Sequence, residues 1–289
     1  MLKIIKSNIP NTITCMSLVC GCVACIMSFN YNVMSGGLYG YQWAFIFIGI
    51  AALFDFCDGA AARLLHAYSN LGKELDSLSD LVSFGVAPGM LIYNTISAFS
   101  DCHWVAYLAI LIPVMGELRL ARFNIDDRQT TSFLGMPIPA NAIFWIGFTA
   151  WIHRYGYPGD IVMALLVVVV SLLMVMTRMK MFSLKFKNFD IRENLRRYII
   201  IIAAIFFVVM YGVAGFAYAI LFYVVLSLVN GNHALIAANG YTLTLDNVTY
   251  FQNTREVHIV GGTLYDKNGV SLSPTAGEKS KIVLSGNKT

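Results

Sequence analysis

Four aspartates in the first third of the chain carry the clearest chemical signal in the sequence. Asp55 and Asp58 are three residues apart, Asp76 and Asp80 are four apart, and strongly apolar sequence flanks them on both sides. On a helix these spacings place each pair on one face. A charge at the centre of a membrane helix costs about 2.5–3.5 kcal/mol, so four carboxylates need a compensating partner. Clustered oxygen ligands suit hard divalent cations, and the pattern predicts a Mg²⁺ or Mn²⁺ site.

The residues between the two acidic pairs leave room for a phosphate-containing ligand. Gly59 and the alanines 60–62 make one side of the helix nearly bare, and Gly72 removes another side chain. A bulky ligand or a second backbone can approach such a surface closely. Arg63 offers a planar fork of donors suited to phosphate oxygens, which suggests a pyrophosphate held by divalent cations at a membrane edge. The alternative is helix packing through small residues, with the acids paired to Arg63 and Lys73.

The whole stretch resembles the signature of the CDP-alcohol phosphatidyltransferases, D-x-x-D-G-x-x-A-R-x8-G-x3-D-x3-D. Every fixed position of that signature is matched between Asp55 and Asp80. The flanking text is similar to the phosphatidylserine synthase branch of the family, in the segments Lys73–Pro88, Arg119–Asn124 and Gly135–Pro139. The resemblance covers residues 8–228 and leaves the C-terminal residues outside it.

The resemblance implies an enzyme that transfers a phosphatidyl group from CDP-diacylglycerol to L-serine, which gives phosphatidylserine and CMP. The divalent cation, Mg²⁺ or Mn²⁺, would be held by Asp55, Asp58, Asp76 and Asp80. Asp80 would also be the general base that takes the proton of the serine hydroxyl. The cations would neutralise the pyrophosphate and polarise the phosphorus that is attacked.

The resemblance also implies which residues contact the two substrates. Those that would bind CDP-diacylglycerol are Gly59, Ala62, Arg63 and Gly72. Arg119 and Arg122 share a helix face at a spacing of three and could hold a phosphate or the carboxylate of the acceptor. Ordinary basic anchoring at the membrane surface competes with this interpretation of the two arginines.

The composition excludes an ordinary soluble protein. Of the 289 residues, 57% are hydrophobic and 12% are charged, with a mean hydropathy of +0.66, whereas soluble domains carry about 25% charged residues. The sequence predicts an all-α polytopic membrane protein of about eight transmembrane helices with a short β-rich C-terminal tail. The expected spans are 12–29, 41–63, 73–98, 103–122, 138–153, 160–177, 198–214 and 216–229. The last two form one apolar block, either a tight helical hairpin or one long helix.

Basic residues predict the orientation, because they alternate between successive connections and gather beside the acidic motif. The positive-inside rule then places the N-terminus and the active site in the cytoplasm, in a multi-pass protein of the cell (inner) membrane. Lys3 and Lys6 precede an apolar run that we interpret as an uncleaved first helix, with Asn11 as its N-terminal cap. The basic run 178–197 is expected to lie at the membrane surface, attracted to anionic lipid.

Residues 1–229 are predicted to form the transmembrane phosphatidyltransferase domain, and residues 230–289 a cytoplasmic tail of unknown role. In the tail, the segments 240–250 and 256–265 alternate apolar and polar residues and contain Asn, Asp and Gly, which is typical of strands and hairpins. Family members commonly pair, so we expect a homodimer in contact with membrane lipid, and no nucleic-acid partner.

Two alternatives to serine transfer remain at this stage. The acidic motif is common to enzymes whose acceptor is glycerol 3-phosphate or an inositol phosphate. Intramembrane acids are also how ion carriers bind cations, so a cation carrier is the alternative of a different class. The four acids form a single cluster without a matching set in the other half of the chain, which disfavours a carrier.

Overall fold

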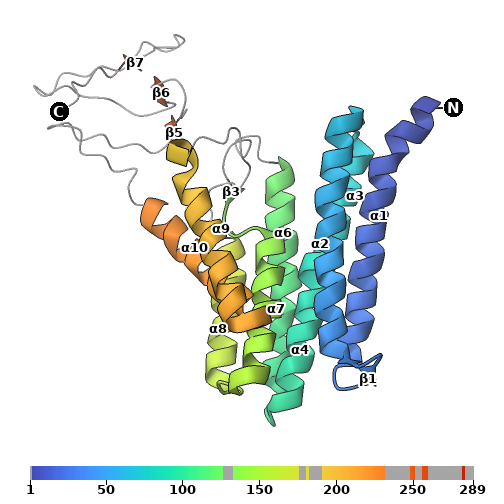
Figure 1. The fold of residues 1–289 in the computed structure, drawn as a ribbon, viewed down its shortest axis with the longest axis vertical. Coiled ribbons are helices and arrows are strands. Elements are labelled where there is room, and N and C mark those ends of the chain that lie inside the picture. The colour runs from blue at the N-terminus through green and yellow to red at the C-terminus, as the bar shows by residue number, and fades with distance from the viewer. Residues whose placement is uncertain are drawn as a thin grey trace, which may run out of the picture. The chain divides into compact units, whose positions relative to one another are not determined.

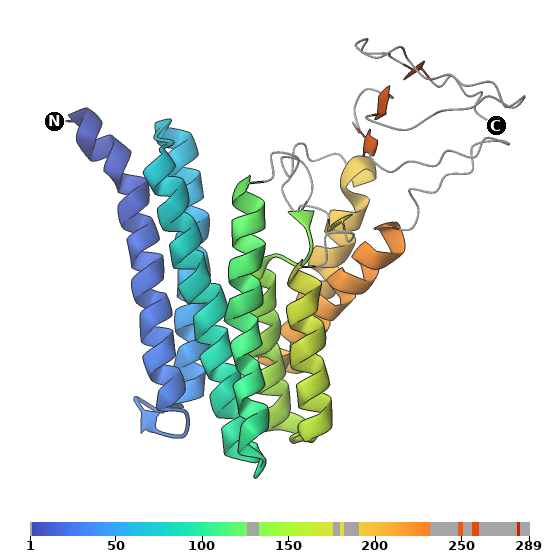
Figure 2. The same cartoon turned by 180° about the vertical axis from the view of Figure 1, so that it is seen from behind.

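The computed structural model describes residues 2–125, 133–175, 180–181, 191–231, 248–250, 256–259 and 282–283. The chain divides into two compact units, Met1–Gly231 and Asn232–Thr289. The first unit is a bundle of helices (Figure 1). It contains all four motif aspartates. Its long helices from α1 to α8 run side by side in both views, and α9 and α10 are inclined across them (Figure 2).

The apolar runs form helices because a helix satisfies its own backbone hydrogen bonds where no water is available. The α-helices are α1 (Leu2–Phe29), α2 (Gly40–Leu65), α3 (Asn70–Asp80), α4 (Ala87–Phe99), α5 (His103–Ala106), α6 (Leu111–Ile125), α7 (Ile138–Tyr155), α8 (Asp160–Val175), α9 (Ile191–Tyr211) and α10 (Gly215–Gly231). The other helical segments are the π-helix η1 (Leu81–Val86) and the 3₁₀-helices η2 (Tyr107–Ile110) and η4 (Gly212–Ala214). Two short antiparallel strand pairs are β1 (Met34–Ser35) with β2 (Leu38–Tyr39), and β3 (Phe133–Leu134) with β4 (Lys180–Met181).

The predicted class, a mostly helical membrane protein, is confirmed. In the described part of the chain five helical segments are long and apolar enough to cross a membrane: Asn8–Phe29, Gly40–Leu65, Asn70–Phe99, His103–Ile125 and Arg197–Ser227. The last segment contains both α9 and α10. The predicted spans at 138–153 and 160–177 correspond to α7 and α8, which are not among these five. The predicted count of about eight therefore stays a prediction.

The apolar block 198–229 is a helical hairpin. Helix α9 ends at Tyr211, Gly212 takes a left-handed φ of +62°, and α10 returns along α9. A Cβ on Gly215 would collide with the backbone of Phe207, so only glycine allows the two helices to approach this closely at the turn. The rings of Tyr211 and Tyr218 pack against each other between the two helices, with their centres 4.9 Å apart.

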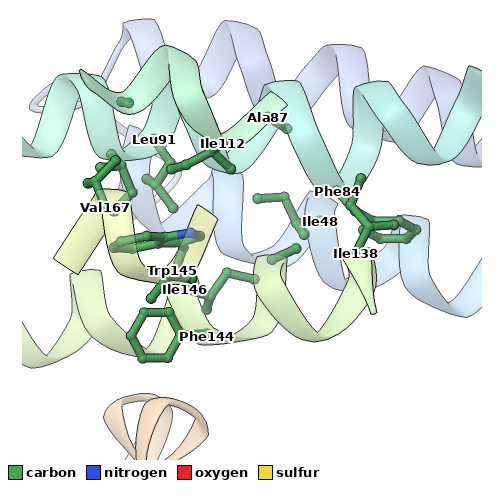
Figure 3. Close-up of a cluster of buried hydrophobic side chains, with 14 of the residues drawn as sticks. Ile48, Phe84, Ala87, Leu91, Ile112, Ile138, Phe144, Trp145, Ile146 and Val167 are labelled. Carbon is green, nitrogen blue, oxygen red and sulfur yellow. The ribbon is translucent and has the colours of Figure 1, made fainter. Parts of the chain in front are cut away.

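The hydrophobic core lies between α2, η1, α4, α6, α7 and α8 (Figure 3). Its largest fully buried side chain is Trp145 of α7, which Figure 3 shows between Leu91 and Ile112 on one side and Phe144 on the other. The hairpin is anchored to the same helix, because a Cβ on Gly147 would collide with the backbone of Ala217 in α10. Close packing of this kind fixes the relative positions of the helices that carry the acids.

A π-helix follows directly after Asp80, the last residue of α3. Pro88 has no N–H, so the carbonyl of Phe84, four residues earlier, lacks its α-helical donor. The side-chain amide of Asn141 in α7 donates to that carbonyl at 3.5 Å, and the Asn141 Oδ1 accepts from the Trp145 Nε1 at 2.9 Å. Buried polar groups in α7 therefore support the irregular turn next to the acidic motif.

The prediction that Asn11 caps the first helix is wrong. Helix α1 starts at Leu2 and continues through Pro10, which lies inside it. A proline inside a helix removes one backbone hydrogen bond and often kinks or breaks the helix, but α1 is helical on both sides of Pro10. Thr12 and Thr14 then bond their hydroxyls to the carbonyls of Asn8 and Pro10, one turn back along the helix.

The second unit is described at three short strands. They are β5 (Val248–Tyr250), β6 (Glu256–Ile259) and β7 (Ile282–Val283), and β6 pairs antiparallel with both of the others. Most of the tail lies outside the described residues, so its predicted β-rich character stays a prediction. Most of the basic run 178–197 also lies outside the described residues.

Candidate active site

A short connection brings the two acidic helices together. Helix α2 carries Asp55 and Asp58 and ends at Leu65, where His66 takes a left-handed φ of +50°. The hydroxyl of Ser69 accepts a hydrogen bond from the N–H of Gly72 at 2.9 Å and so caps the start of α3. The chain therefore reverses within residues 66–69 and returns with Asp76 and Asp80 on α3.

Three of the four aspartates converge. Carboxylate oxygens of Asp55, Asp76 and Asp80 lie within 4.8 Å of one another, and all three side chains are half-buried. Oxygens bound to one hard cation at about 2.0–2.6 Å are at most about 4–5 Å apart. Both the spacing and the all-carboxylate donor set therefore fit a cation such as Mg²⁺ or Mn²⁺.

The fourth aspartate, Asp58, is held separately. Its side chain is buried, and its Oδ2 accepts a hydrogen bond from the hydroxyl of Thr14 at 2.5 Å. Thr14 is on α1, which packs against both α2 and α3. Asp58 is outside the group of three converging carboxylates.

Arg119 of α6 lies next to the acidic group. Its side chain is 7% exposed, and its guanidinium interacts electrostatically with the carboxyl group of Asp80 and with the hydroxyl of Tyr223 on α10. The guanidinium also lies 5.8 Å from the ring centre of Phe123. Within the described residues its Nε has no hydrogen-bond partner, which is unusual because a buried charged donor without a partner is costly. The arrangement offers an anion a buried donor.

The neighbouring cations make structural contacts instead. Arg122 is exposed, and its Nη1 donates to the carbonyl of Val175 at 3.0 Å, at the end of α8. Lys73 donates to the carbonyl of Asn124 at 3.1 Å, near the end of α6. Cations in these positions satisfy carbonyls that a helix end leaves without a donor. Arg63 is exposed at the end of α2.

The small residues of the motif have different surroundings. A Cβ on Gly59 would meet no atom within 4 Å, so the surface of α2 beside it is open. A Cβ on Gly72 would lie 3.0 Å from the Oδ1 of Asn11 and from the Oγ of Ser69. Gly72 therefore lets α1 approach α3 closely, whereas the open space is at Gly59. Ala62 is half-buried on the last turn of α2.

Sequence reasoning missed the polar residues that other helices bring to the acids. Thr14 comes from α1 and Tyr223 from α10, both far from the motif in the sequence. Thr14 and Ser17, three residues apart in an apolar helix, do form a detectable polar pair on one face. Tyr223 stands in a run rich in aromatic residues and carries no such signal.

Comparisons with known proteins agree with the acidic motif. The sequence pattern that describes the CDP-alcohol phosphatidyltransferases matches residues 7–177, which is more than half of the chain. The chain is 42% identical over 132 residues to the CDP-diacylglycerol–serine O-phosphatidyltransferase of Bacillus subtilis, covering 45% of this chain and 69% of that protein. It is 38% identical over 144 residues to the enzyme of the same name from Methanocaldococcus jannaschii, covering 50% of this chain and 66% of the relative.

An archaeal relative has a different name. The chain is 38% identical over 138 residues to the archaetidylserine synthase of Methanothermobacter thermautotrophicus, covering 46% of this chain and 55% of that protein. The chain thus spans between about half and about two thirds of the length of these relatives. The shared region includes the residues that form the acidic group.

Proposed function

The chain belongs to the CDP-alcohol phosphatidyltransferase family, and we propose that it transfers a phosphatidyl group from CDP-diacylglycerol to L-serine. The products are phosphatidylserine and CMP. The observation that carries this proposal is the convergence of Asp55, Asp76 and Asp80 at the motif that identifies the family. Relatives named for transfer to serine, or for synthesis of archaetidylserine, support serine as the acceptor.

Asp55, Asp76 and Asp80 would hold a divalent cation, Mg²⁺ or Mn²⁺, with Asp58 as a further ligand. When bound, the cation supplies charge that neutralises the pyrophosphate and polarises the phosphorus under attack. The aspartate carboxylates would determine the position of the cation. The open surface at Gly59 would receive the nucleotide end of CDP-diacylglycerol, beside Ala62, with the exposed Arg63 on a phosphate oxygen. The contribution of Gly72 would be indirect, through the close packing of α1 on α3.

In the reaction the serine hydroxyl oxygen attacks the phosphorus that carries the diacylglycerol. A new oxygen–phosphorus bond forms, the bond from that phosphorus to the oxygen of CMP breaks, and CMP leaves with the bonding electrons. Asp80 would accept the proton of the serine hydroxyl, because it stands at the end of α3 within the acidic group. A positioned base of this kind contributes about 10²–10⁴-fold to the rate.

Arg119 is the better candidate for binding the serine carboxylate. It is buried, it interacts electrostatically with Asp80, and its Nε has no partner among the residues that the structure describes, whereas Arg122 is exposed and donates to the carbonyl of Val175. A guanidinium next to the general base would hold serine by its carboxylate with the hydroxyl near the phosphorus. Glycerol 3-phosphate and inositol phosphates also carry anions, so Arg119 alone does not select serine.

The finer points of topology belong to the same proposal. We place about eight helices across the cell (inner) membrane, with the N-terminus and the active site on the cytoplasmic side. On that side both CDP-diacylglycerol headgroups and soluble serine are available. Residues 1–229 would form the catalytic domain, as one half of a homodimer, and residues 230–289 a cytoplasmic tail.

The acceptor can be tested directly with the purified full chain in detergent and CDP-diacylglycerol. We expect CMP release with L-serine and little with glycerol 3-phosphate or an inositol phosphate. CMP release with glycerol 3-phosphate and none with serine would contradict the choice of acceptor. Cation flux into proteoliposomes without any CMP release would favour the carrier.

A further inference from the structure

Thr14 lies where α1 packs against both acidic helices. Its hydroxyl donates to the Oδ2 of Asp58 on α2 at 2.5 Å, and its carbonyl accepts a hydrogen bond from the hydroxyl of Ser79 on α3 at 3.1 Å. The three residues are 5%, 6% and 3% exposed, respectively. One buried residue of α1 therefore bonds to an acid of the first pair and to the neighbour of Asp80 in the second.

The contact with Asp58 is more than helix packing because the Thr14 hydroxyl bonds directly to one of the two carboxylate oxygens. Thr14 occupies one oxygen of Asp58 and leaves the other free of this bond. The hydroxyl has a single proton and a second acceptor in reach, the Pro10 carbonyl at 3.0 Å. An ionised carboxylate is the stronger acceptor of the two. The bond therefore holds the Asp58 carboxylate in one fixed orientation.

We propose that Thr14 is a positioning residue for the cation site and acts through Asp58. Its hydroxyl fixes the Asp58 carboxylate before a cation arrives, so binding does not have to order that side chain. Through the Ser79 hydrogen bond the same residue ties this carboxylate to the helix that carries Asp76 and Asp80. The inference rests on the proposed function, because it assumes that a divalent cation occupies the acidic group.

A matched contact one turn along α1 separates positioning from packing. The hydroxyl of Ser17 donates to the carbonyl of Ala51 on α2 at 3.0 Å, and Ser17 is 1% exposed. This bond joins the same two helices at similar burial, but its acceptor is a backbone carbonyl. Removing the Ser17 hydroxyl therefore measures how much the packing of α1 against α2 alone contributes to Mn²⁺ affinity.

The test compares Thr14→Val, which removes the hydroxyl but keeps the shape, with Thr14→Ser, which keeps the hydroxyl, and with Ser17→Ala. Mn²⁺ binding to the purified full chain in detergent, without substrates, is measured from the electron paramagnetic resonance signal of free Mn²⁺. We expect Thr14→Val to weaken Mn²⁺ binding about 10- to 100-fold, the usual effect of removing a partner of a metal ligand. The dissociation constants of Thr14→Ser and Ser17→Ala for Mn²⁺ should stay within a factor of about three of the wild-type value, because neither substitution removes a partner of a metal ligand.

Thermal unfolding in EDTA shows whether each variant is folded. Both Thr14→Val and Ser17→Ala should lower the midpoint, since each loses one buried hydrogen bond. If Thr14→Val does not fold, Thr14→Cys provides a weaker donor of similar size and should show a smaller loss in the same direction. Wild-type Mn²⁺ affinity in folded Thr14→Val, or in Thr14→Cys where Thr14→Val does not fold, would overturn the positioning role, and so would an equal loss of affinity in Ser17→Ala. A wild-type chain that binds no Mn²⁺ would overturn the cation site and this inference together, which is a distinct outcome.

Discussion

The buried guanidinium of Arg119 on α6 interacts electrostatically with the carboxyl group of Asp80 on α3. These residues are separated by almost forty positions in the sequence, yet the fold brings Arg119 to one of three converging acids. In the part of the chain that the structure describes, the Arg119 Nε has no hydrogen-bond partner. A small acceptor that carries both a carboxylate and a hydroxyl matches this pair. Arg119 would take the carboxylate, and Asp80 would take the hydroxyl proton.

Replacing Arg119 by Gln should raise the KM for serine about 10- to 100-fold. That range corresponds to the loss of one charge-assisted hydrogen bond, about 1.5–3 kcal/mol. Arg122→Gln is the matched control, because Arg122 bonds to the Val175 carbonyl instead; it should leave the KM nearly unchanged. Steady-state kinetics with serine varied at saturating CDP-diacylglycerol measure both. Equal effects of the two substitutions would remove Arg119 from the acceptor site.

A leucine at Gly59 should block CDP-diacylglycerol while the protein still folds. The space beside Gly59 is open, and leucine is a better helix former than glycine, so stability should not fall. Gly49 on the same helix is equally open and provides the control. We expect Gly59→Leu to raise the KM for CDP-diacylglycerol at least about tenfold, equivalent to roughly 1.4 kcal/mol, and Gly49→Leu to behave like wild type. Full activity in folded Gly59→Leu would show that the nucleotide binds elsewhere.

Asp80→Asn should lower kcat at least about a hundredfold, because it removes the proposed base. The assay is run at saturating Mn²⁺, and CDP-diacylglycerol binding is followed separately as a rise in the thermal midpoint. Glu74→Gln is the control, since Glu74 is an exposed acid on the same helix and outside the converging group. An Asp80→Asn protein that turns over at nearly the wild-type rate would mean that another group accepts the serine proton.

Truncation after Gly231 should leave most of the activity. The family pattern ends at residue 177, and the converging acids and Arg119 all lie in the unit that ends at Gly231. The measurement is turnover per folded protein in detergent, with thermal unfolding as the check on folding. A truncated protein that stays folded but no longer turns over would show that residues 232–289 contribute to catalysis.

The spacing of the acids placed each pair on one helix face, because side chains three or four positions apart on a helix lie together. Asp55 of α2 converges with Asp76 and Asp80 of α3. From the same spacing we predicted Asp58 to be a cation ligand equivalent to the other three aspartates. The structure separates it, because Thr14 of α1 bonds to its carboxylate. Which helix packs against an acid depends on tertiary contacts that one motif does not encode.

The helical hairpin shows the same limit. The apolar block 198–229 fitted either a tight helical hairpin or one long helix. Contacts between segments that are apart in the sequence decide in favour of the hairpin. Gly215 lies against Phe207, and Gly147 of α7 lies against Ala217. At the N-terminus, the predicted cap at Asn11 placed a boundary that the helix does not have, because α1 continues through Pro10 and starts at Leu2.

The most direct test of serine transfer at the acidic site follows both products in one sample. Purified full-length protein is given CDP-diacylglycerol and labelled L-serine, and labelled phosphatidylserine and CMP are quantified together, with Asp76→Asn prepared in parallel. We predict equal amounts of the two products, loss of both in EDTA, recovery with added Mg²⁺ or Mn²⁺, and neither product with Asp76→Asn. Product formation that persists in EDTA or in the folded Asp76→Asn protein, or CMP release without labelled lipid, would contradict the account.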